Sequence, residues 1–370
     1  MVRSGAVPAE GPIVTIIAVE SGRRSLSTLV AARGTAVAWG EGVSLDVREP
    51  AVKLIAIEEH FRAPVFRSMA AESGFDRAMD ADNPMAERLA RLDEVGPQRL
   101  ADMDAAGIDM QVISQTVGAT SDASLEAFAE ANDELAKAIA PHPDRFAGFA
   151  ALPMSNPSAA ADELTRAVRS LGFKGALLDG TVDGRFLDDE FFWPVFETAE
   201  QLQAPIYLHP AEPPEPVRGA YYSGLTAPVA QMLATAGWGW HVETGLHALR
   251  LILGGVFDRF PTLQLISGHM GEALPFMLAR TSRNLDAVAK LHKPVADYFV
   301  ENFYVTTSGM FAHQPLLCLL LVVGADRVIF SVDYPYSSNA EARSFIEAAP
   351  ISPADRDKIA HRNAERLLGL

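Results

Sequence analysis

Residues 190–210 read EFFWPVFETAEQLQAPIYLHP, a segment of helical pattern followed at once by a short apolar run that ends in His-Pro. The apolar side chains of the first part recur at the spacing of one helix face. The second part is almost entirely apolar, as in a parallel strand that is covered on both sides. The segment therefore predicts a helix over 190–203 and a buried parallel strand over 204–210.

The same pattern recurs along most of the chain and decides the fold class. Seven more apolar runs have the length and composition of buried strands: LIAIEEH (54–60), MQVISQ (110–115), FAGFAALP (146–153), FKGALLDG (173–180), LQLISGHM (263–270), FYVTTSG (303–309) and RVIFSVDYP (327–335). Amphipathic segments such as SLEAFAEANDELAKAIA (124–140) and AADELTRAVRSLG (160–172) lie between them. Strands that alternate with helices in this number predict an α/β fold, a (β/α)8 TIM barrel, more naturally than an open doubly wound sheet. No glycine-rich turn follows an early strand of the sequence, which argues further against a dinucleotide-binding fold.

Residues 1–50 lack this pattern. Two short β-branched runs, IVTIIAV (13–19) and TAVAWG (35–40), are separated by polar and glycine-containing segments. They are compatible with a hairpin or with a flexible extension, and an isolated pair of strands is marginally stable. We therefore expect an N-terminal extension of unknown structure over 1–50 and a barrel domain over 51–370.

Composition and charge exclude several classes of protein. The 370 residues include 31 Lys and Arg against 47 Asp and Glu, a formal net charge of −16 that repels phosphate backbones and anionic lipids. Nucleic acid and membrane partners are therefore not expected. The one cysteine, Cys318, lies in the apolar run LLCLLLVV (316–323) and is expected in the core of a cytoplasmic protein. The early run PIVTIIAV (12–19) is short and is followed by charged residues, so we expect neither a signal peptide nor a membrane span.

Polar residues able to bind a metal ion follow four of the predicted strands. Glu58 and His60 end the first strand, His209 the fifth, His269 the sixth and Asp333 the eighth. Closing a barrel brings the carboxyl ends of its strands to one mouth. Because Glu58 and His60 are two residues apart on an extended strand, they point to the same face and can bind one ion. Carboxylate and imidazole ligands favour one divalent transition metal, Zn²⁺ or Mn²⁺, with a coordination position left open for substrate or water.

Each of these residues also has a simpler interpretation. A histidine at a strand end is commonly a hydrogen-bonded structural residue, and Asp333, before a Tyr-Pro pair, has the sequence of a turn. Agreement in chemistry among four strand ends favours the metal site. His241 and His247, in the helical segment WHVETGLHALRLILGG (240–255), are interpreted instead as packing or loop-edge residues.

Six motifs carry a resemblance to a known family. They are IEEHF (57–61), DMDAAGID (102–109), YLHP (207–210), GVFDRFPTLQLISGHMGEALPF (255–276), ENFYVTTSG (301–309) and ADRVIFSVDYPY (325–336). On these motifs, residues 53–370 resemble the amidohydrolase-related superfamily, and within it the nonoxidative decarboxylases of γ-resorcylate, 2,3-dihydroxybenzoate and 5-carboxyvanillate. Those decarboxylases tend to carry Arg-x-Asp after the GHMGE motif, whereas this chain reads Arg280-Thr281-Ser282-Arg283. The resemblance therefore supports the chemistry more strongly than it identifies the substrate.

The resemblance implies which residues are ligands and which are catalytic. Its metal ligands fall on Glu58, His60, His209 and Asp333, and its catalytic histidine falls on His269 with Glu272 as partner. Many relatives begin with His-x-His, whereas Glu58-x-His60 is the form associated with the decarboxylases. A carboxylate in place of an imidazole lowers the charge of the metal site and makes the bound ion a weaker activator of water. This exchange favours chelation of a substrate over hydrolysis.

The expected reaction is loss of CO2 from a hydroxylated aromatic, or comparably enolisable, carboxylic acid, which makes the protein a carboxy-lyase. We expect Asp333 to donate a proton to the ring carbon and His269 to accept a hydrogen bond or proton from the substrate hydroxyl. Phe61, Tyr336 and the aromatic residues of 221–240 are candidate walls for the ring. Arg280 either anchors a substrate anion or belongs to a surface ion pair.

Two other functions remain open for the same residues. One is a hydrolase or hydratase that acts through metal-bound hydroxide, with Asp333 as general base. The other is a barrel without catalytic activity, against which the intact set of polar strand ends argues. The resemblance also implies a homo-oligomer, a dimer or a tetramer.

Overall fold

The computed structural model describes residues 14–20, 23–29, 52–67, 90–116 and 123–370 of the chain. The chain divides into two compact units, Met1–Ala51 and Val52–Leu370. In the first unit, strand β1 (Val14–Glu20) pairs antiparallel with β2 (Arg23–Leu29). The apolar run at 13–19 therefore pairs with the segment that follows it directly, and the second apolar run, 35–40, lies outside the described residues.

The second unit contains eight parallel strands within the residues that the structure describes. They are β3 (Ile55–Phe61), β4 (Met110–Gln115), β5 (Phe146–Gly148), β6 (Ala176–Asp179), β7 (Ile206–His209), β8 (Leu265–Ser267), β9 (Phe303–Thr306) and β10 (Val328–Ile329). Each strand is hydrogen-bonded to the next strand along the chain, in one sheet of β3-β4-β5 and a second of β6-β7-β8-β9-β10. All eight lie within the apolar runs predicted from the sequence, apart from Phe61 at the end of β3.

Hydrogen bonds between the two sheets close them into a barrel. Ala150 forms a parallel bridge with Ala176, which connects β5 to β6. At the other seam, the backbone N–H of His60 donates to the carbonyl of Tyr334 at 2.7 Å. The hydroxyl of Ser331 accepts from the N–H groups of Ile57 at 3.1 Å and Glu58 at 2.7 Å. The segment after β10 thus pairs with β3, and the prediction of a (β/α)8 barrel is confirmed.

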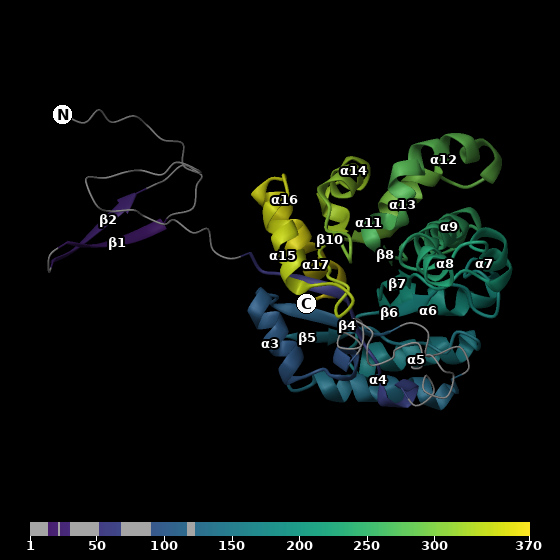
Figure 1. Ribbon diagram of the computed structural model, residues 1–370, viewed down its shortest axis with the longest axis horizontal. Coiled ribbons are helices and arrows are strands. Elements are labelled where there is room, and N and C mark those ends of the chain that lie inside the picture. The colour runs from purple at the N-terminus through teal and green to yellow at the C-terminus, as the bar shows by residue number, and fades with distance from the viewer. Residues whose placement is uncertain (1–13, 21–22, 30–51, 68–89, 117–122) are drawn as a thin grey trace. The chain divides into compact units, whose positions relative to one another are not determined.

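Helices connect the strands and surround them (Figure 1). They are α3 (Pro97–Ala106), α4 (Leu125–Ile139), α5 (Pro157–Ser170), α6 (Trp193–Leu202), α7 (Glu215–Tyr221), α8 (Ala227–Ala234), α9 (Gly239–Leu253), α10 (Val256–Arg259), α11 (His269–Glu272), α12 (Leu274–Ala289), α13 (Val295–Asn302), α14 (His313–Val323), α15 (Asn339–Ala348), α16 (Pro353–Asp357) and α17 (Asn363–Leu368). Local sequence sets several of the ends: the Ser124 hydroxyl accepts from Ala127 N–H at the start of α4, and Gly107 ends α3 with a φ of 66°. Among the described residues, none of these helices has the length and apolarity needed to span a membrane.

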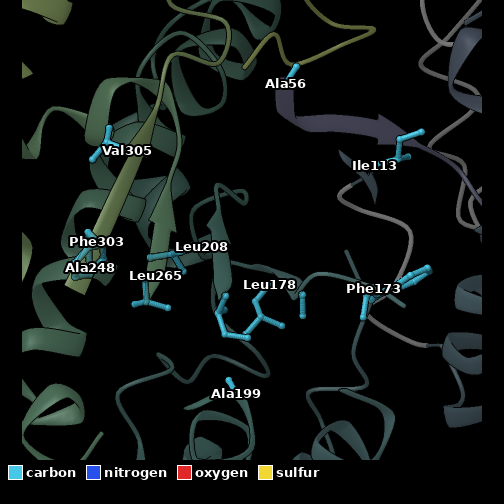
Figure 2. Close-up of a cluster of buried hydrophobic side chains, with 14 of the residues drawn as sticks. Ala56, Ile113, Phe173, Leu178, Ala199, Leu208, Ala248, Leu265, Phe303 and Val305 are labelled. Atoms are coloured by element: carbon cyan, nitrogen blue, oxygen red, sulfur yellow. The ribbon is translucent and has the colours of Figure 1, made fainter. Parts of the chain in front are cut away.

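The strands bury side chains on both faces. A smaller cluster fills the barrel interior and includes Ile55, Ile57, Val112, Phe149, Leu177, Tyr207, Ile266, Tyr304 and Ile329. The alternate residues belong to the larger cluster beneath the helices, and Figure 2 labels Ala56, Ile113, Leu178, Leu208 and Leu265 among them. This alternation explains why the strands read as nearly continuous apolar runs. Cys318, expected in the core, has a partly exposed side chain on α14 instead.

An irregularity in β3 breaks the alternation at the mouth of the barrel. The pairing of β3 with β4 shifts register between Ala56 and Glu59. Ile57 belongs to the interior cluster, and the next side chain, Glu58, also reaches inward to the hydroxyl of Tyr207. A bulge lets two consecutive side chains share one face of a strand. The strand can therefore complete its apolar layer and still place Glu58 and His60 above it.

Candidate functional site

Three of the predicted ligands meet at the carboxyl ends of β3 and β7. Glu58, His60 and His209 are 0%, 1% and 5% exposed, and one potential ligand atom of each lies within 4.8 Å of the others. Glu58 Oε1 is 3.3 Å from His209 Nε2. The barrel thus brings Glu58 and His209, 151 positions apart in the sequence, into one buried group, as the strand ends predicted.

Two atoms of this group are buried without a hydrogen-bond partner among the described residues, Glu58 Oε1 and His60 Nε2. The other oxygen of Glu58 accepts from the hydroxyls of Tyr207 and, at 3.2 Å, Thr306. His209 Nδ1 faces the carbonyl of Pro210 at 2.8 Å, so its Nε2 is the nitrogen left for the group. Buried polar atoms are rarely left unpaired, since each costs roughly 1–3 kcal/mol. One carboxylate oxygen and two imidazole nitrogens are a donor set that fits a divalent transition metal.

Asp333 and His269 lie beside these three residues. Asp333 Oδ1 is 3.3 Å from His60 Nε2, and its Oδ2 is 3.8 Å from His269 Nε2. His269 Nε2 is also 3.9 Å from Glu58 Oε1. Asp333 has a φ of 72°, in the left-handed region that non-glycine residues seldom adopt. All five polar residues at the predicted strand ends therefore lie at one mouth of the barrel.

Glu59 holds the backbone that carries Asp333, and the sequence interpretation missed it. Its Oε1 accepts from Val332 N–H at 2.9 Å and its Oε2 from Tyr334 N–H at 3.1 Å. Burial raises the pKa of Glu59 to about 8, although the two backbone hydrogen bonds act in the opposite direction. The signal in the sequence is a second acidic residue inside a buried strand, which must find partners in the fold.

Glu272 lies in a short turn of unusual backbone that supports His269. His269, Met270 and Glu272 have φ values of 46°, 58° and 55°, and Gly271 between them has 82°. Glu272 Oε1 is 2.8 Å from His269 Nδ1, which leaves His269 Nε2 directed toward Asp333 and Glu58. The pairing of His269 with Glu272 implied by the family resemblance is present in the structure.

His241 forms a hydrogen bond with the second oxygen of the Glu272 carboxylate. Its Nδ1 is 2.6 Å from Glu272 Oε2, and its Nε2 is 3.0 Å from the carbonyl of Ala236. The sequence interpretation had taken His241 for a packing residue of α9. Its partner is 31 positions away in the sequence, so no local pattern could have paired them.

The electrostatics of the site favour positive charge. Burial alone would raise the pKa of Glu58. The charge of His269 and the neighbouring imidazoles outweigh this effect and hold the pKa well below its usual range. Burial lowers the pKa of His209, yet the neighbouring carboxylates of Asp179 and Glu58 raise it to about 10. His269 is affected in the same way by the charges of Glu272 and Glu58, and its pKa lies well above the usual value. The buried carboxylates thus create a negative potential that stabilises positive charge in this pocket, either on an imidazole or on a bound cation.

The remaining predicted residues lie at different distances from this chemistry. Tyr336 is close, with its ring centroid 5.6 Å from that of His60 and its hydroxyl 2.6 Å from Thr116 Oγ1. Burial raises the pKa of Tyr336 to about 12. Phe61 is 5% exposed and packs in the larger hydrophobic cluster. Arg280 is exposed on α12, and its side chain forms no ion pair with the described residues.

A cavity of about 230 Å³ opens at the ends of β4, β5 and β6. Its lining residues are Gln115, Phe128, Ala150, Ala151, Leu152, Met154, Ser155, Leu177, Leu178, Asp179, Thr181, Val182, Asp183 and Ala211. Asp179 lies between the cavity and the group of Glu58, His60 and His209, since its Oδ1 lies 3.5 Å from His209 Nδ1. The described part of the wall is mostly apolar and holds no Lys, Arg or His.

Comparison with known proteins gives a consistent result. A family model described as amidohydrolase matches residues 57–370. The γ-resorcylate decarboxylase of Polaromonas sp. is 40% identical over 332 residues, which cover 85% of this chain and 98% of the relative.

Two solved structures have the same fold. A dihydroxybenzoic acid decarboxylase from Polaromonas sp., with bound manganese and the inhibitor 2-nitroresorcinol, has a TM-score of 0.78 at 37% identity and covers 86% of this chain and 97% of its own. The 5-carboxyvanillate decarboxylase from Sphingomonas paucimobilis has a TM-score of 0.77 at 34% identity and covers 86% of this chain and 99% of its own.

Proposed function

Because this chain belongs to the amidohydrolase family, we propose that it is a metal-dependent carboxy-lyase that removes CO2 from a hydroxylated aromatic carboxylic acid without oxidation. The observation that carries the proposal is the buried group of Glu58, His60 and His209, in which two polar atoms lack a partner within the described residues. A carboxylate rather than a third imidazole in this group suits substrate chelation better than activation of water.

One divalent cation is the cofactor that these residues fit. Glu58, His60 and His209 would hold it, with Asp333 as the fourth ligand. Manganese in the related structure favours Mn²⁺, and the same ligands accept Zn²⁺. When bound, the cation supplies a Lewis acid that attracts substrate oxygens and lowers the pKa of a hydroxyl group.

The chain's own residues move the protons. A proton on Asp333 passes to the ring carbon that bears the carboxylate. The bond from that carbon to the carboxylate then breaks, and its electron pair restores the aromatic ring as CO2 leaves. In its neutral form His269 accepts a hydrogen bond or proton from the substrate hydroxyl, and Glu272 fixes the orientation of its ring. His269 Nε2, 3.8 Å from Asp333, is also placed to return a proton to that carboxylate.

The mostly apolar cavity supports an aromatic substrate that carries no second carboxylate on the part that enters the cavity. Phe128, Leu152 and Met154 offer a surface for a ring or its substituent, while Asp179 can accept from a hydroxyl. A second carboxylate would meet Asp179 and Asp183 without a compensating cation among the described lining residues. In this proposal the aromatic ring of the substrate lies against Phe61 and Tyr336, and Arg280 binds an anionic group of the substrate.

Metal analysis and a panel of hydroxybenzoates test this function together. We expect about one transition-metal ion per chain, CO2 release from an ortho-hydroxy aromatic acid, and one deuterium at the vacated ring carbon when the reaction runs in D2O. His209→Ala should abolish metal retention with the fold preserved, whereas His292→Ala, at an exposed position, should retain the metal. Hydrolysis of amides or lactones without CO2 release would replace this proposal with the hydrolase alternative.

We further propose a cytoplasmic homo-oligomer, either a dimer or a tetramer. The single cysteine supports a reducing compartment. Exposed apolar side chains on α12 and α14 support association, since Phe276 and Leu321 are 81% and 89% exposed. Light scattering on the purified protein gives the mass that decides between monomer, dimer and tetramer.

A further inference from the structure

One face of helix α9 contacts both the side chain and the backbone of Glu272. His241 and Gly245, one helical turn apart on α9, lie on this face. The ring of His241 reaches the Glu272 carboxylate at 2.6 Å. At Gly245 the helix comes so close that a Cβ atom would lie 2.6 Å from the carbonyl oxygen of Glu272. The helix therefore fixes this residue at two points.

The Glu272 carboxylate is divided between two histidines. Its side chain is 1% exposed, with Oε1 at 2.8 Å from His269 Nδ1 and Oε2 at 2.6 Å from His241 Nδ1. The two imidazole rings lie edge to face with centroids 4.9 Å apart. A carboxylate bound on one side alone can rotate about its last bond, whereas one bound on both sides is fixed. The orientation of His269 thus depends on His241 as well as on Glu272.

The partners of His241 define where its hydrogens lie. Its Nδ1 faces a carboxylate and its Nε2 faces the carbonyl of Ala236 at 3.0 Å. Both partners accept hydrogen bonds, so a hydrogen on Nδ1 is directed to Glu272 and a hydrogen on Nε2 to Ala236. The two donors have separate roles: Nδ1 holds Glu272, and Nε2 holds the ring to its own helix start.

We propose that His241 is a positioning residue for the reaction, which holds Glu272 so that His269 presents Nε2 toward Asp333. The role in turnover rests on the proposed function, in which His269 acts on the substrate hydroxyl. Distances of 2.6 and 2.8 Å between nitrogen and oxygen match hydrogen bonds. A second metal ion between these three residues is the competing explanation, since their ligand atoms lie within 4.8 Å of one another.

Three substitutions separate the two donors of His241. In His241→Asn the side-chain amide takes the place of Nδ1 and can still donate to Glu272. In His241→Gln it takes the place of Nε2 and reaches only Ala236. His241→Phe keeps the ring and removes both donors, and His292→Phe, at a position that is 79% exposed, is the matched control.

We expect turnover per bound metal to fall on the order of 10- to 100-fold in His241→Phe and His241→Gln, with KM changed less than about threefold. His241→Asn should recover most of the loss, and His292→Phe should equal the unsubstituted protein. Normal turnover in His241→Phe, or recovery by Gln and not by Asn, would overturn the proposal. So would loss of a second metal ion per chain in His241→Phe.

A spectroscopic test does not depend on activity. Ring N–H protons bound to a buried carboxylate give exchangeable proton NMR signals at unusually low field. The protein should show two, from His241 and His269, of which His241→Phe removes one and shifts the other. His292→Phe should leave both. If the protein releases no CO2 from any tested acid, the proposed function fails, while these signals still decide whether His241 fixes Glu272.

Discussion

Glu59 shows how a residue between two proposed metal ligands can position a third residue far away in the sequence. Glu58 and His60 point into the mouth of the barrel, and Glu59 points instead to the segment after β10. Its two oxygens hold the N–H groups on either side of Asp333. The left-handed backbone of Asp333 is therefore maintained from β3, the strand that supplies two of the proposed ligands.

Replacing Glu59 with leucine tests this support. Glu59→Leu leaves the N–H groups of Val332 and Tyr334 without their acceptor, and each buried unpaired group costs roughly 1–3 kcal/mol. We expect urea unfolding to give a free energy of unfolding lower by about 2–4 kcal/mol, and turnover per bound metal lower by about 10- to 100-fold. Glu347→Leu, at a half-exposed ion pair, should change stability by less than about 0.5 kcal/mol. Equal stability in the two variants would show that Glu59 does not hold this segment.

His247 should link the stability of the barrel to pH. Its Nε2 accepts from the N–H of Leu187 at 2.8 Å, and burial lowers its pKa from 6.5 to about 3. In the unfolded chain the imidazole binds a proton near pH 6.5, whereas in the folded protein it stays neutral until near pH 3. Stability from this residue is thus complete above about pH 6.5 and is lost as the pH falls toward 3.

The slope of stability against pH measures this contribution. Between about pH 6.5 and about pH 4.5 we expect a loss of roughly 2 kcal/mol from this group in the free energy of unfolding. His247→Gln keeps an acceptor for Leu187 and cannot titrate, so its curve should be flatter by that amount. His292→Gln, exposed and on another helix connection, should follow the original curve. Parallel curves for the protein and His247→Gln would contradict the assignment.

At the scale of the elements, the strands were predictable because their apolar runs are long. Most of the runs extend beyond the paired residues: FKGALLDG covers 173–180, whereas β6 pairs only over Ala176–Asp179. Several flanking residues, among them Gly175, Gly268 and Thr307, are buried too, and the apolar pattern reports burial rather than pairing.

The turn after β8 could not be predicted from the apolar pattern of the sequence. The run LQLISGHM predicts a strand through Met270, but β8 ends at Ser267 and α11 begins at His269 with left-handed backbone. Hydrophobic spacing does not encode such φ values, and a hydrogen bond to the turn comes from His241 on α9. The proposed metal ligands could be placed from the strand ends, while the roles of His241 and Glu59 required the packed structure.

Packing of α9 on this turn leaves no room for a methyl group. In Gly245→Ala the new Cβ would meet a backbone oxygen of Glu272, which cannot move aside as a flexible side chain would. We expect a loss of about 1–3 kcal/mol in stability, despite the better helix propensity of alanine, and lower turnover. Gly219→Ala on α7 has open space around its Cβ and should be neutral or up to about 1 kcal/mol more stable. Thermal unfolding of the two variants makes the comparison.

At the scale of the whole molecule, the barrel should fold without the N-terminal unit. The second compact unit begins at Val52, and its first strand pairs only with segments of the same unit in the described structure. Deletion of residues 1–45 should therefore give a protein with unchanged helical circular dichroism, about one bound metal ion and turnover within about twofold of the full chain. An aggregated or unfolded product would show that the extension covers an essential surface.

The hydrogen bonds that join β3 to the segment after β10 make the barrel a closed ring. Lys53 Nζ lies 2.7 Å from Glu365 Oε1, so the start of the barrel unit and its last helix are neighbours in space. Every strand therefore has two neighbouring strands, and this order would stay the same if the chain were opened at a different loop. The position of the N-terminus decides which strand comes first in the sequence, whereas the strands of the barrel form a ring without a first or last member. Glu58 and Asp333, 275 positions apart along the polypeptide, therefore lie on neighbouring segments of that ring.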